Sequence, residues 1–500
     1  MGCVFVDKFR AITHAKVEMS AFKTEGRRAV VTWCGLSRTL VLASLMIVCS
    51  HSWQRALAQL PDTTQQKPGS VEPDESPTTM FPHQPDGRFW FSGQTNIVDQ
   101  AHPPFSATYS GPSSFQTKAE NAVGEVTTLY MGMQFTRSSE ILLDFENTAG
   151  LGLSGALGIA GFTNLDAVRD ATLSDTPYLS RVIYHQVFAL DHEKVDGNRG
   201  PLSTFAKLPA RRLELRVGRF GMTDEFDTNT VGSDSHLQFL NWSVDQNGAY
   251  DFTGDARGYT WGALVEYQSP LWGARFAEAL MPGPQNGGPL VWDLRKANTS
   301  NAEIELHHGV LRRKDGMIRV LGYLNHANMG VYSEAIKQYL QDGSAQPDIG
   351  DHPFRVTSKS GFGINVEQAI TPNITLYSRF GWNDGKTESW VFTEIDHTGS
   401  GGIGISGKLW KRNNDRTGAA FALNGISKVH ARYLALGGIG FVLGDGELQY
   451  GLEKEIEAYY TAHVWRGLYL GPDLQCIVDP GYNKARGPIV VSSFRIHTEF

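Results

Sequence analysis

Sixteen short runs of alternating polar and apolar residues, joined by connections that are alternately long and short, constrain the fold of this chain most strongly. Side chains two positions apart in a strand lie on the same face, so each run has the period of a β-strand. The runs lie at residues 88–98, 125–136, 138–146, 181–189, 211–219, 258–268, 271–279, 301–310, 316–325, 359–369, 373–382, 401–411, 416–424, 446–464, 467–478 and 488–500. The pattern predicts an all-β fold.

The lengths of the connections indicate which all-β fold this is. After odd-numbered runs the connections are long, most clearly at residues 100–124, 147–180, 220–257, 280–300, 326–358 and 425–445, whereas after most even-numbered runs there is a tight turn. The connection at 190–210 breaks this rule. A soluble sandwich would show the same period in each strand, but one rim of loops and one rim of turns is typical of a membrane barrel. We therefore predict a transmembrane antiparallel up-and-down β-barrel of about 16 strands over residues 88–500, with long extracellular loops and short periplasmic turns.

The last run, residues 488–500, alternates up to the final residue of the sequence. Its apolar face carries Val490, Phe494, Ile496 and Phe500, and its polar face carries Ser493, Arg495, His497 and Glu499. In a closed barrel the last strand pairs with the first, which removes exposed strand edges, and aromatic residues concentrate at the membrane interface. We expect Phe500 to end the closing strand and to be the feature through which the barrel-assembly machinery recognises the chain. An even number of strands places both termini at the periplasmic rim.

The first part of the chain reads as a targeting segment. The apolar run at 39–49 is too short to span a bilayer, follows Arg27, Arg28 and Arg38, and precedes the small-residue sequence Ala-Leu-Ala at 56–58. We predict a signal peptide over residues 1–58, with a start that is over-extended if Met19 is the true first residue. Residues 59–87 are rich in proline and poor in apolar residues, which predicts a disordered linker.

Charge and cysteine content exclude several classes of function. The net charge is −7, and the predicted signal peptide holds more basic than acidic residues, so the mature chain is still more acidic and nucleic acid is not an expected partner. Three of the four cysteines lie within residues 1–58, which leaves Cys476 and no internal disulfide.

No cofactor is expected. The segment 402–409 approaches a phosphate-binding loop, but Leu409 replaces the hydroxyl residue and its glycines suit a strand. His307 and His308 lack a third ligand at metal spacing.

Long blocks of the sequence resemble the OprB family of carbohydrate-selective outer-membrane porins. They include residues 218–243, 256–267, 361–368, 381–394 and 430–453, and the segment DPGYNKARGP at 479–488 before the closing strand. The resemblance implies a sixteen-stranded barrel in the Gram-negative outer membrane, surrounded by lipid and lipopolysaccharide. It also implies passive diffusion of glucose and similar sugars through a charged constriction that contains arginine.

Candidate residues for contact with the sugar come from two regions. By resemblance to general porins, we expect the third long loop, 220–257, to fold into the lumen, and it offers acids, amides and an indole that suit sugar hydroxyls and pyranose faces. The loop candidates are Asp224, Asp227, Asn229, Asp234, Asn241, Trp242 and Arg257. Strand parity directs the wall candidates inward, namely Trp90, Gln94, Glu214, Arg216, Glu367, Tyr377, Arg379 and Arg495.

Three alternatives to a sugar pore stay open at this point. A non-selective or ion-conducting porin would share the fold, and so would a closed structural or adhesive barrel. An outer-membrane barrel enzyme such as a hydrolase needs a converging nucleophile and base, and the sequence shows no glycine-framed serine motif. We therefore expect no enzyme. The expected partners are mono- or small oligosaccharides, and the chain can be a monomer or a homotrimer.

Overall fold

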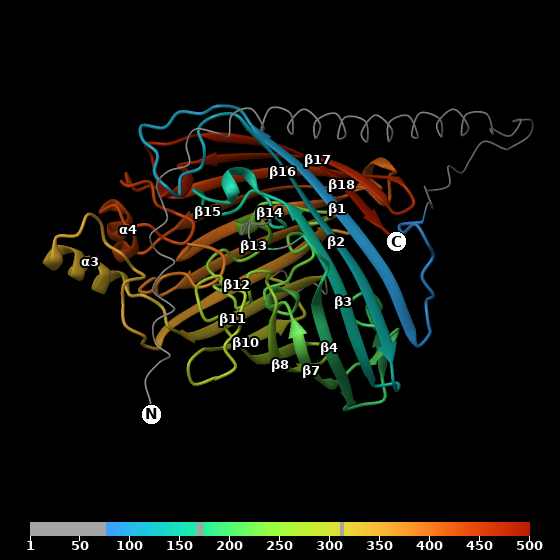
Figure 1. The fold of residues 1–500 in the computed structure, drawn as a ribbon. Coiled ribbons are helices and arrows are strands. Elements are labelled where there is room, and N and C mark those ends of the chain that lie inside the picture. Colours follow the sequence, from blue (N-terminus) through green and yellow to red (C-terminus); the bar gives the residue numbers. More distant parts are fainter. Residues whose placement is uncertain (1–76, 168–172, 174, 311–314) are drawn as a thin grey trace, which may run out of the picture. The chain divides into compact units, whose positions relative to one another are not determined.

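A computed structural model describes residues 77–500 except 168–172, 174 and 311–314. These residues belong to one compact unit, a closed barrel of sixteen strands in which each strand pairs antiparallel with its sequence neighbours in the barrel. The strands are β1 (Phe89–His102), β2 (Glu120–Gln134), β3 (Ser139–Gly150), β4 (Tyr178–Ala189), β7 (Arg212–Phe220), β8 (Thr260–Gln268), β9 (Trp272–Ala279), β10 (Asn298–Leu306), β11 (Gly316–Ala327), β12 (Thr357–Thr371), β13 (Ile374–Asn383), β14 (His397–Ser406), β15 (Arg416–Gly425), β16 (Glu453–Trp465), β17 (Leu468–Val478) and β18 (Ile489–Glu499). Each predicted run overlaps one of them (Figure 1).

The barrel closes between β1 and β18, as the terminal alternation predicts. Their register pairs Gln94 with Glu499 and Ile97 with Ile496. Beyond the last paired residue, Phe500 exchanges two backbone hydrogen bonds with Gly93, at 2.6 and 2.9 Å. The Phe500 ring lies where a side chain on Gly93 would stand, since a Cβ there would be 2.5 Å from ring carbons. Glycine at this position lets the terminal aromatic cover the seam of the barrel.

The connections also follow the predicted alternation. We name the long ones L1 to L8, at residues 103–119, 151–177, 221–259, 280–297, 328–356, 384–396, 426–452 and 479–488. The helices of the described chain lie within connections: η1 (Leu153–Gly155), η2 (Met222–Asp224), α2 (Trp242–Asp245), α3 (Tyr332–Asp342), η3 (Gly407–Trp410), α4 (Lys428–Ala435) and η4 (Pro480–Tyr482). Figure 1 shows α3 and α4 at the long-loop rim, at the end of the barrel away from the C-terminus. All helices in the described residues are too short or too polar to cross a bilayer.

The connection between β4 and β7, residues 190–211, is the exception to the rule of short turns. It contains a separate two-stranded sheet of β5 (Lys194–Asp196) and β6 (Lys207–Pro209). We call this connection the arm. Its sequence is thus longer than a turn because it forms a hairpin of its own at the short-turn rim.

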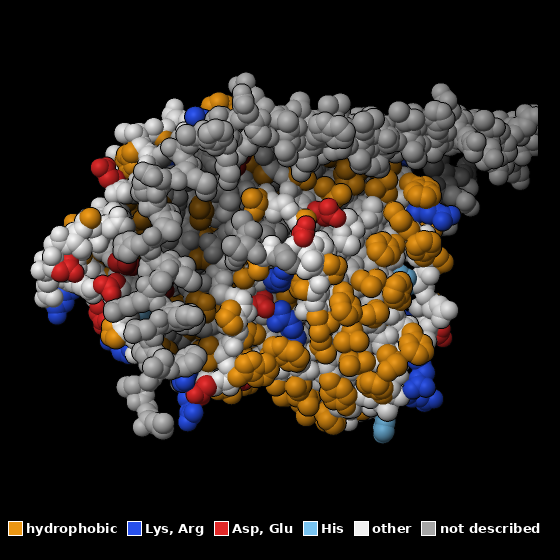
Figure 2. All heavy atoms as spheres, in the orientation of Figure 1, with side chains coloured by type: hydrophobic (Ala, Val, Ile, Leu, Met, Phe, Trp, Pro, Cys, Tyr) orange, Lys and Arg blue, Asp and Glu red, His pale blue; other side chains and the backbone are white. Residues whose placement is uncertain are grey.

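The two faces of the wall differ as the alternation requires. Large hydrophobic side chains are exposed on the outer face, and Figure 2 shows many of them side by side over the strands. They include Val217, Val265, Phe276, Ile304, Val320, Ile364, Phe380, Phe421, Ile456, Leu474 and Phe494. The neighbouring positions of these strands turn inward and are mostly polar or charged, yet buried. A wall that is apolar outside and polar inside suits lipid around the barrel and loops within it.

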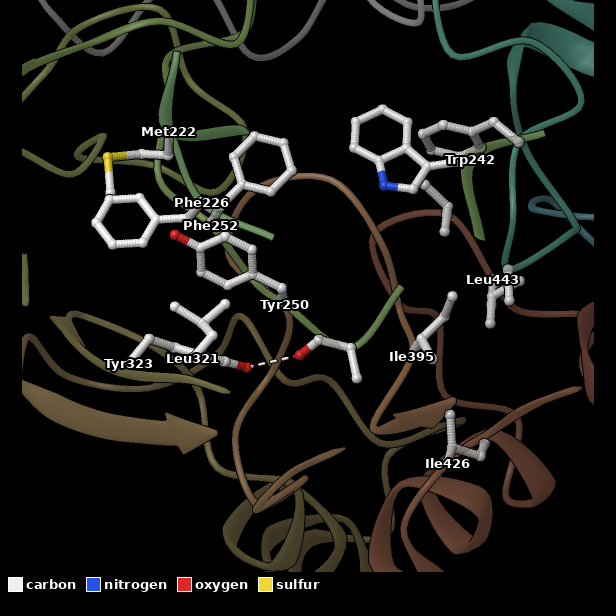
Figure 3. Close-up of a cluster of buried hydrophobic side chains, with 14 of the residues drawn as sticks. Met222, Phe226, Trp242, Tyr250, Phe252, Leu321, Tyr323, Ile395, Ile426 and Leu443 are labelled. Carbon is white, nitrogen blue, oxygen red and sulfur yellow. Dashed lines mark hydrogen bonds between the residues drawn. The ribbon is translucent and has the colours of Figure 1, made fainter. Parts of the chain in front are cut away.

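The largest hydrophobic cluster is formed by the long connections and the wall beside them. Figure 3 shows Met222, Phe226, Tyr250 and Phe252 of L3 near Leu321 and Tyr323 of β11, with the Tyr323 hydroxyl donating to the Ala249 carbonyl at 2.7 Å. Residues of L2, L5, L6, L7 and L8 and of β3, β4, β8 and β9 also belong to the cluster. L3 is therefore packed into a core that it shares with the other long connections and the inner wall.

The predicted signal peptide and residues 59–76 of the predicted linker lie outside the described residues. The remainder of that linker, residues 77–87, contacts the rim where the C-terminus ends. The Met80 amide donates to the Glu499 carbonyl at 2.8 Å, and the Tyr469 hydroxyl donates to the Thr78 carbonyl at 3.1 Å. Both ends of the barrel domain thus lie at the short-turn rim.

Candidate functional site

L3 crosses the inside of the barrel, as expected for the third long loop. Inward-facing side chains of several strands hold it. Glu303 of β10 accepts from the Asp227 amide at 2.8 Å, Glu367 of β12 accepts from both the amide and the hydroxyl of Thr230 at 2.8 Å, and Arg495 of β18 donates to the Gln238 carbonyl at 2.7 Å. Backbone groups that are buried between L3 and the wall need such partners because little water reaches them.

Arg379 of β13 makes the densest set of contacts with L3. Its side chain is fully buried and forms an ion pair with Asp227, with 2.8 Å between Nε and Oδ2. Its terminal nitrogens donate to the carbonyls of residues 227, 232, 244 and 245 at 2.6 to 3.1 Å. Tyr377, two residues earlier, donates to the Val244 carbonyl at 3.0 Å. One guanidinium thus binds two stretches of L3, residues 227–232 and residues 244–245, to the same point of the wall.

Three glutamates of β16 hold the loops from the other side. Glu457 accepts from the Leu240 amide at 2.5 Å, Glu455 accepts from the Ser243 hydroxyl, and Glu453 accepts from the amides of Ala160 and Gly161 in L2 at 2.9 to 3.0 Å. Since the glutamates stand two residues apart, strand parity points all three inward. L2 and L3 are therefore bound to the wall between β10 and β18.

The space that these loops leave lies beside β1 to β4. It is a cavity of about 700 Å³. Its lining comes from inward residues of β1 to β4, from L2 and L3, from Asn286 of L4 and Phe392 of L6, and from residues 198 and 200–202 of the arm. The cavity thus extends from the long connections toward the short-turn rim along one side of the barrel.

Arginine and carboxylate side chains line the middle of the cavity together. Arg181 forms two hydrogen bonds with Asp224, at 2.7 and 2.8 Å. The Arg257 guanidinium stacks on the Tyr178 ring, with its carbon 3.8 Å from the ring centroid. Tyr178 donates in turn to Glu146. Paired charges and hydroxyls at this density can exchange hydrogen bonds with a polar solute in either direction.

Further carboxylates line the cavity opposite these arginines. Asp166 of L2 accepts from Asn96 at 2.9 Å and lies 3.6 Å from His236. Burial raises the pKa of Asp245, in helix α2, to about 7, although Arg379 opposes this shift. Asp245 is therefore only partly charged at neutral pH, and its contribution to the field in the cavity changes with pH.

Aromatic rings form the part of the cavity nearest to L6. The rings of Trp242, Phe252 and Phe392 stack on one another, with centroid distances of 5.9 Å between the first two, 5.2 Å between the first and the third, and 5.0 Å between the last two. Phe162 meets Trp242 edge-on at 5.4 Å. All four rings line the cavity.

A family model described as "Carbohydrate-selective porin, OprB family" matches residues 137–500 of the chain. The chain belongs to the OprB family of carbohydrate-selective porins. Its closed barrel and its location in the outer membrane, as a channel for passive diffusion, follow from this membership. No match was found among curated protein sequences.

One solved structure supports the fold of this porin, and two others are similar to it at lower scores. It is similar to the high-pH structure of Pseudomonas putida OprB, at 16% identity and a TM-score of 0.62, over 83% of this chain and 94% of that chain. The low-pH structure of the same protein matches at 13% identity and a TM-score of 0.44, over 83% and 93%. The outer-membrane channel DcaP of Acinetobacter baumannii matches at 9% identity and a TM-score of 0.47, over 84% and 100%.

The porin structure separates the predicted site residues into two groups. Five line the cavity: Gln94, Asp224, Asp234, Trp242 and Arg257. Others are bound to the loops or to the wall. Asn241 is fully buried as the N-cap of α2, where its side chain accepts from the Ser243 amide at 3.0 Å. Asn229 is also buried, and its side-chain oxygen accepts from two amides of its own loop.

The wall candidates all face inward but serve different contacts. Glu367, Tyr377, Arg379 and Arg495 bind L3, as described above. Arg216 contacts Glu225 of L3 at 2.8 Å and Glu214 of its own strand at 3.0 Å. Trp90 lies near the short-turn rim, where the Arg199 guanidinium stands 5.3 Å from its ring. Strand parity therefore gave the correct face, while the neighbours on that face come from distant segments.

Several residues that line the cavity were not predicted from the sequence, namely Glu146, Phe162, Asp166, Tyr178, Arg181, His236, Phe252, Tyr259 and Phe392. Parity within β3 and β4 would have indicated Glu146 and Arg181. Tyr178, the first residue of β4, lies beyond a register shift between β3 and β4, so parity did not indicate it. Phe162, Phe252, Tyr259 and Phe392 carry no such signal, because they come from L2, L3 and L6 and meet only in the folded loops.

Proposed function

We propose that mono- and small oligosaccharides, glucose among them, cross this porin through the cavity beside β1 to β4. In this proposal the long-loop rim faces the outside of the cell, and the short-turn rim, with both ends of the barrel domain, faces the periplasm. Transport is passive, and the protein is not an enzyme and needs no cofactor. Lipid and lipopolysaccharide surround the outer wall. The barrel-assembly machinery recognises the chain through Phe500.

The stacked rings of Trp242, Phe252 and Phe392 carry the proposal. Trp242 and Phe252 are mostly buried in this stack, so a sugar ring would meet the part of the aromatic surface that borders the cavity, and this contact requires no charge on the solute. The next residues along the cavity, Arg257 and Arg181, present charged donors beside carboxylates. Alternating donors and acceptors replace part of the hydration of the sugar at each position, and each contact is weak enough for the sugar to move on.

An ion-conducting porin is the second candidate, and the charges in the cavity favour it. Arg181 and Arg257 lie among Glu146, Asp224 and Asp234. A small ion of either sign would find a partner there. Aromatic stacking distinguishes the two functions, because it assists a sugar but not a hydrated ion.

The test compares two tryptophans of the long loops. Trp242 lines the cavity, whereas Trp292 of L4 is 71% exposed and is not part of the lining. Purified wild-type protein, Trp242→Ala and Trp292→Ala are each studied in planar bilayers, with and without glucose and maltose, and in liposome-swelling assays with a series of sugars. We expect sugars to block the wild-type ion current, the Trp242→Ala variant to bind them about tenfold more weakly, as a loss of roughly 1.4 kcal/mol would give, and Trp292→Ala to behave as wild type.

Three outcomes would contradict parts of the proposal. Wild-type protein that forms no channels would overturn the pore. Channels that pass ions but are not blocked by any sugar, with no swelling in sugar solutions, would favour the ion-conducting alternative. Equal sugar block in both variants would remove the aromatic rings from the path.

A further inference from the structure

Among the short-turn connections that the structure describes, the arm at residues 190–211 is the one that contributes residues to the lining of the cavity. Asn198, Gly200, Pro201 and Leu202 at its tip line the same cavity as Arg181 and His236. Leu202 keeps 38% of its surface exposed there. The other end of the cavity is lined by L3, L4 and L6. The arm and these loops therefore bound the cavity from opposite rims.

Buried side chains of the wall hold the tip in this place. Glu140 of β3 is fully buried, and its carboxylate accepts from the Thr204 amide at 2.8 Å, from the Thr204 hydroxyl, and from the Ser203 hydroxyl at 3.2 Å. Gln134 of β2 donates to the Thr204 carbonyl at 2.7 Å. A carboxylate without water needs such donors, so the tip and Glu140 depend on each other.

The wall is also shaped to receive the arm. Gly132 of β2 faces inward, and a Cβ at this position would stand 2.4 Å from the methyl group of Thr204. Next to this contact, Phe205 packs with Val187 and Leu208 in a small hydrophobic cluster. Arg199 donates to the Phe89 carbonyl at 2.8 Å and lies over the Trp90 ring. Three features thus hold the tip of the arm in place: the space at Gly132, the apolar packing of Phe205, and the contacts of Arg199.

A chain of buried charges joins the arm to L3. His185 of β4 lies between Glu140 and Glu214, at 2.7 Å from each, and Arg216 bridges Glu214 and Glu225 of L3 at 3.0 and 2.8 Å. The two elements that bound the cavity are therefore tied to one row of charged residues across β3, β4 and β7.

We propose that the arm is a second, exit constriction of the sugar path, and that Leu202 at its tip sets the size of solute that can leave. This inference rests on the proposed function. The apolar tip offers a sugar few hydrogen bonds after the charged middle of the cavity, so a sugar is released there rather than held, and discrimination at this point is by size.

The experiment adds bulk to the arm after folding, so that assembly is not at risk. Leu202→Cys is made in a Cys476→Ser background, and the matched control is Val195→Cys on β5 of the same arm. Val195 is 37% exposed, close to the value for Leu202, but does not line the cavity. Both variants are labelled with neutral methanethiosulfonate reagents of increasing size. Labelling is verified by mass, and single-channel conductance and swelling in glucose, maltose and maltotriose are then measured.

We expect labelling at Leu202→Cys to lower conductance by at least half and to slow maltotriose more than glucose, with a larger loss for a larger reagent. Labelling at Val195→Cys and treatment of the Cys476→Ser parent are expected to change neither quantity. Full labelling of Leu202→Cys with unchanged conductance and sugar rates would overturn the exit constriction while leaving the pore intact. A parent protein that forms no channels would overturn the proposed function and this inference with it.

Discussion

Arg379 and Asp227 are 152 residues apart in the chain, yet they form a buried ion pair with 2.8 Å between Nε and Oδ2. The pair joins the middle of β13 to the first part of L3, the loop that crosses the inside of the barrel. Because Arg379 also binds the carbonyls of residues 227, 232, 244 and 245, it holds L3 against the wall.

Replacing Arg379 by Ala should release L3 from the wall. Removing one partner of a buried ion pair costs roughly 3–5 kcal/mol, so we expect higher and noisier single-channel conductance and faster protease cleavage within residues 221–259. The matched control is Arg295→Ala, which removes an ion pair with Asp293 from a side chain that is 90% exposed. A folded Arg379→Ala barrel with wild-type conductance and cleavage would show that L3 is held without this residue.

Deleting Phe500 should impair assembly of the barrel. The deletion removes the two backbone hydrogen bonds with Gly93 and uncovers the seam between β1 and β18. We expect a several-fold lower yield of heat-modifiable protein in the outer membrane. Phe500→Ala keeps the backbone bonds and separates the effect of the ring from that of the chain end. Equal yields for the deletion, Phe500→Ala and wild type would argue against a role for this residue in closure.

Arg257 should contribute to sugar block through the stacked geometry of its guanidinium. Its contribution to ion selectivity should depend on its charge alone. Its guanidinium stacks on Tyr178 in the cavity, and stacking of this kind is a property of arginine that lysine reproduces poorly. We expect Arg257→Ala to weaken glucose block about tenfold and to shift selectivity toward cations. Arg257→Lys should keep the ion selectivity and lose most of the block. If Lys restores both properties, charge is sufficient and the stacked geometry is not needed.

The long-loop rim should loosen as pH rises, because of His430 in α4. Burial by itself lowers the pKa of His430, but Asp396, 3.1 Å away, and Glu394, 3.6 Å away, raise it to about 9. An unfolded histidine has a pKa of about 6.5. The charged histidine therefore stabilises the folded loops fully below about pH 6.5, and this stabilisation is lost as pH rises through about 9.

The measurement for His430 is the rate of protease cleavage within L7 between pH 6 and pH 9.5, after correction for the activity of the protease. We expect the rate to rise over this range in wild type. His430→Gln keeps hydrogen-bonding capacity but cannot titrate, so its rate should be constant, whereas the exposed His192→Gln should behave as wild type. A constant rate in wild type would contradict the prediction.

The lumen residues show how far prediction from the sequence could reach. Parity placed Arg216, Arg379 and Arg495 on the inner face correctly, because the direction of a side chain depends on its position within its own strand. It could not show that Arg379 and Arg495 are covered by L3, or that Arg257 and Arg181 meet at the cavity. Those contacts join segments that no periodic pattern connects.

The sequence by itself determined the sixteen strands, the rim on which each connection lies, the pairing of the last strand with the first and the irregular length of the arm. These features depend on local alternation and on connection length, which the residues express directly. Only the tertiary structure decided where the cavity lies through which we propose that sugars pass. That cavity is the space left when L2 and L3 bind to the wall from β10 to β18 and the arm seats against Gly132, and its shape depends on hydrogen bonds and packing between residues that lie far apart in the chain.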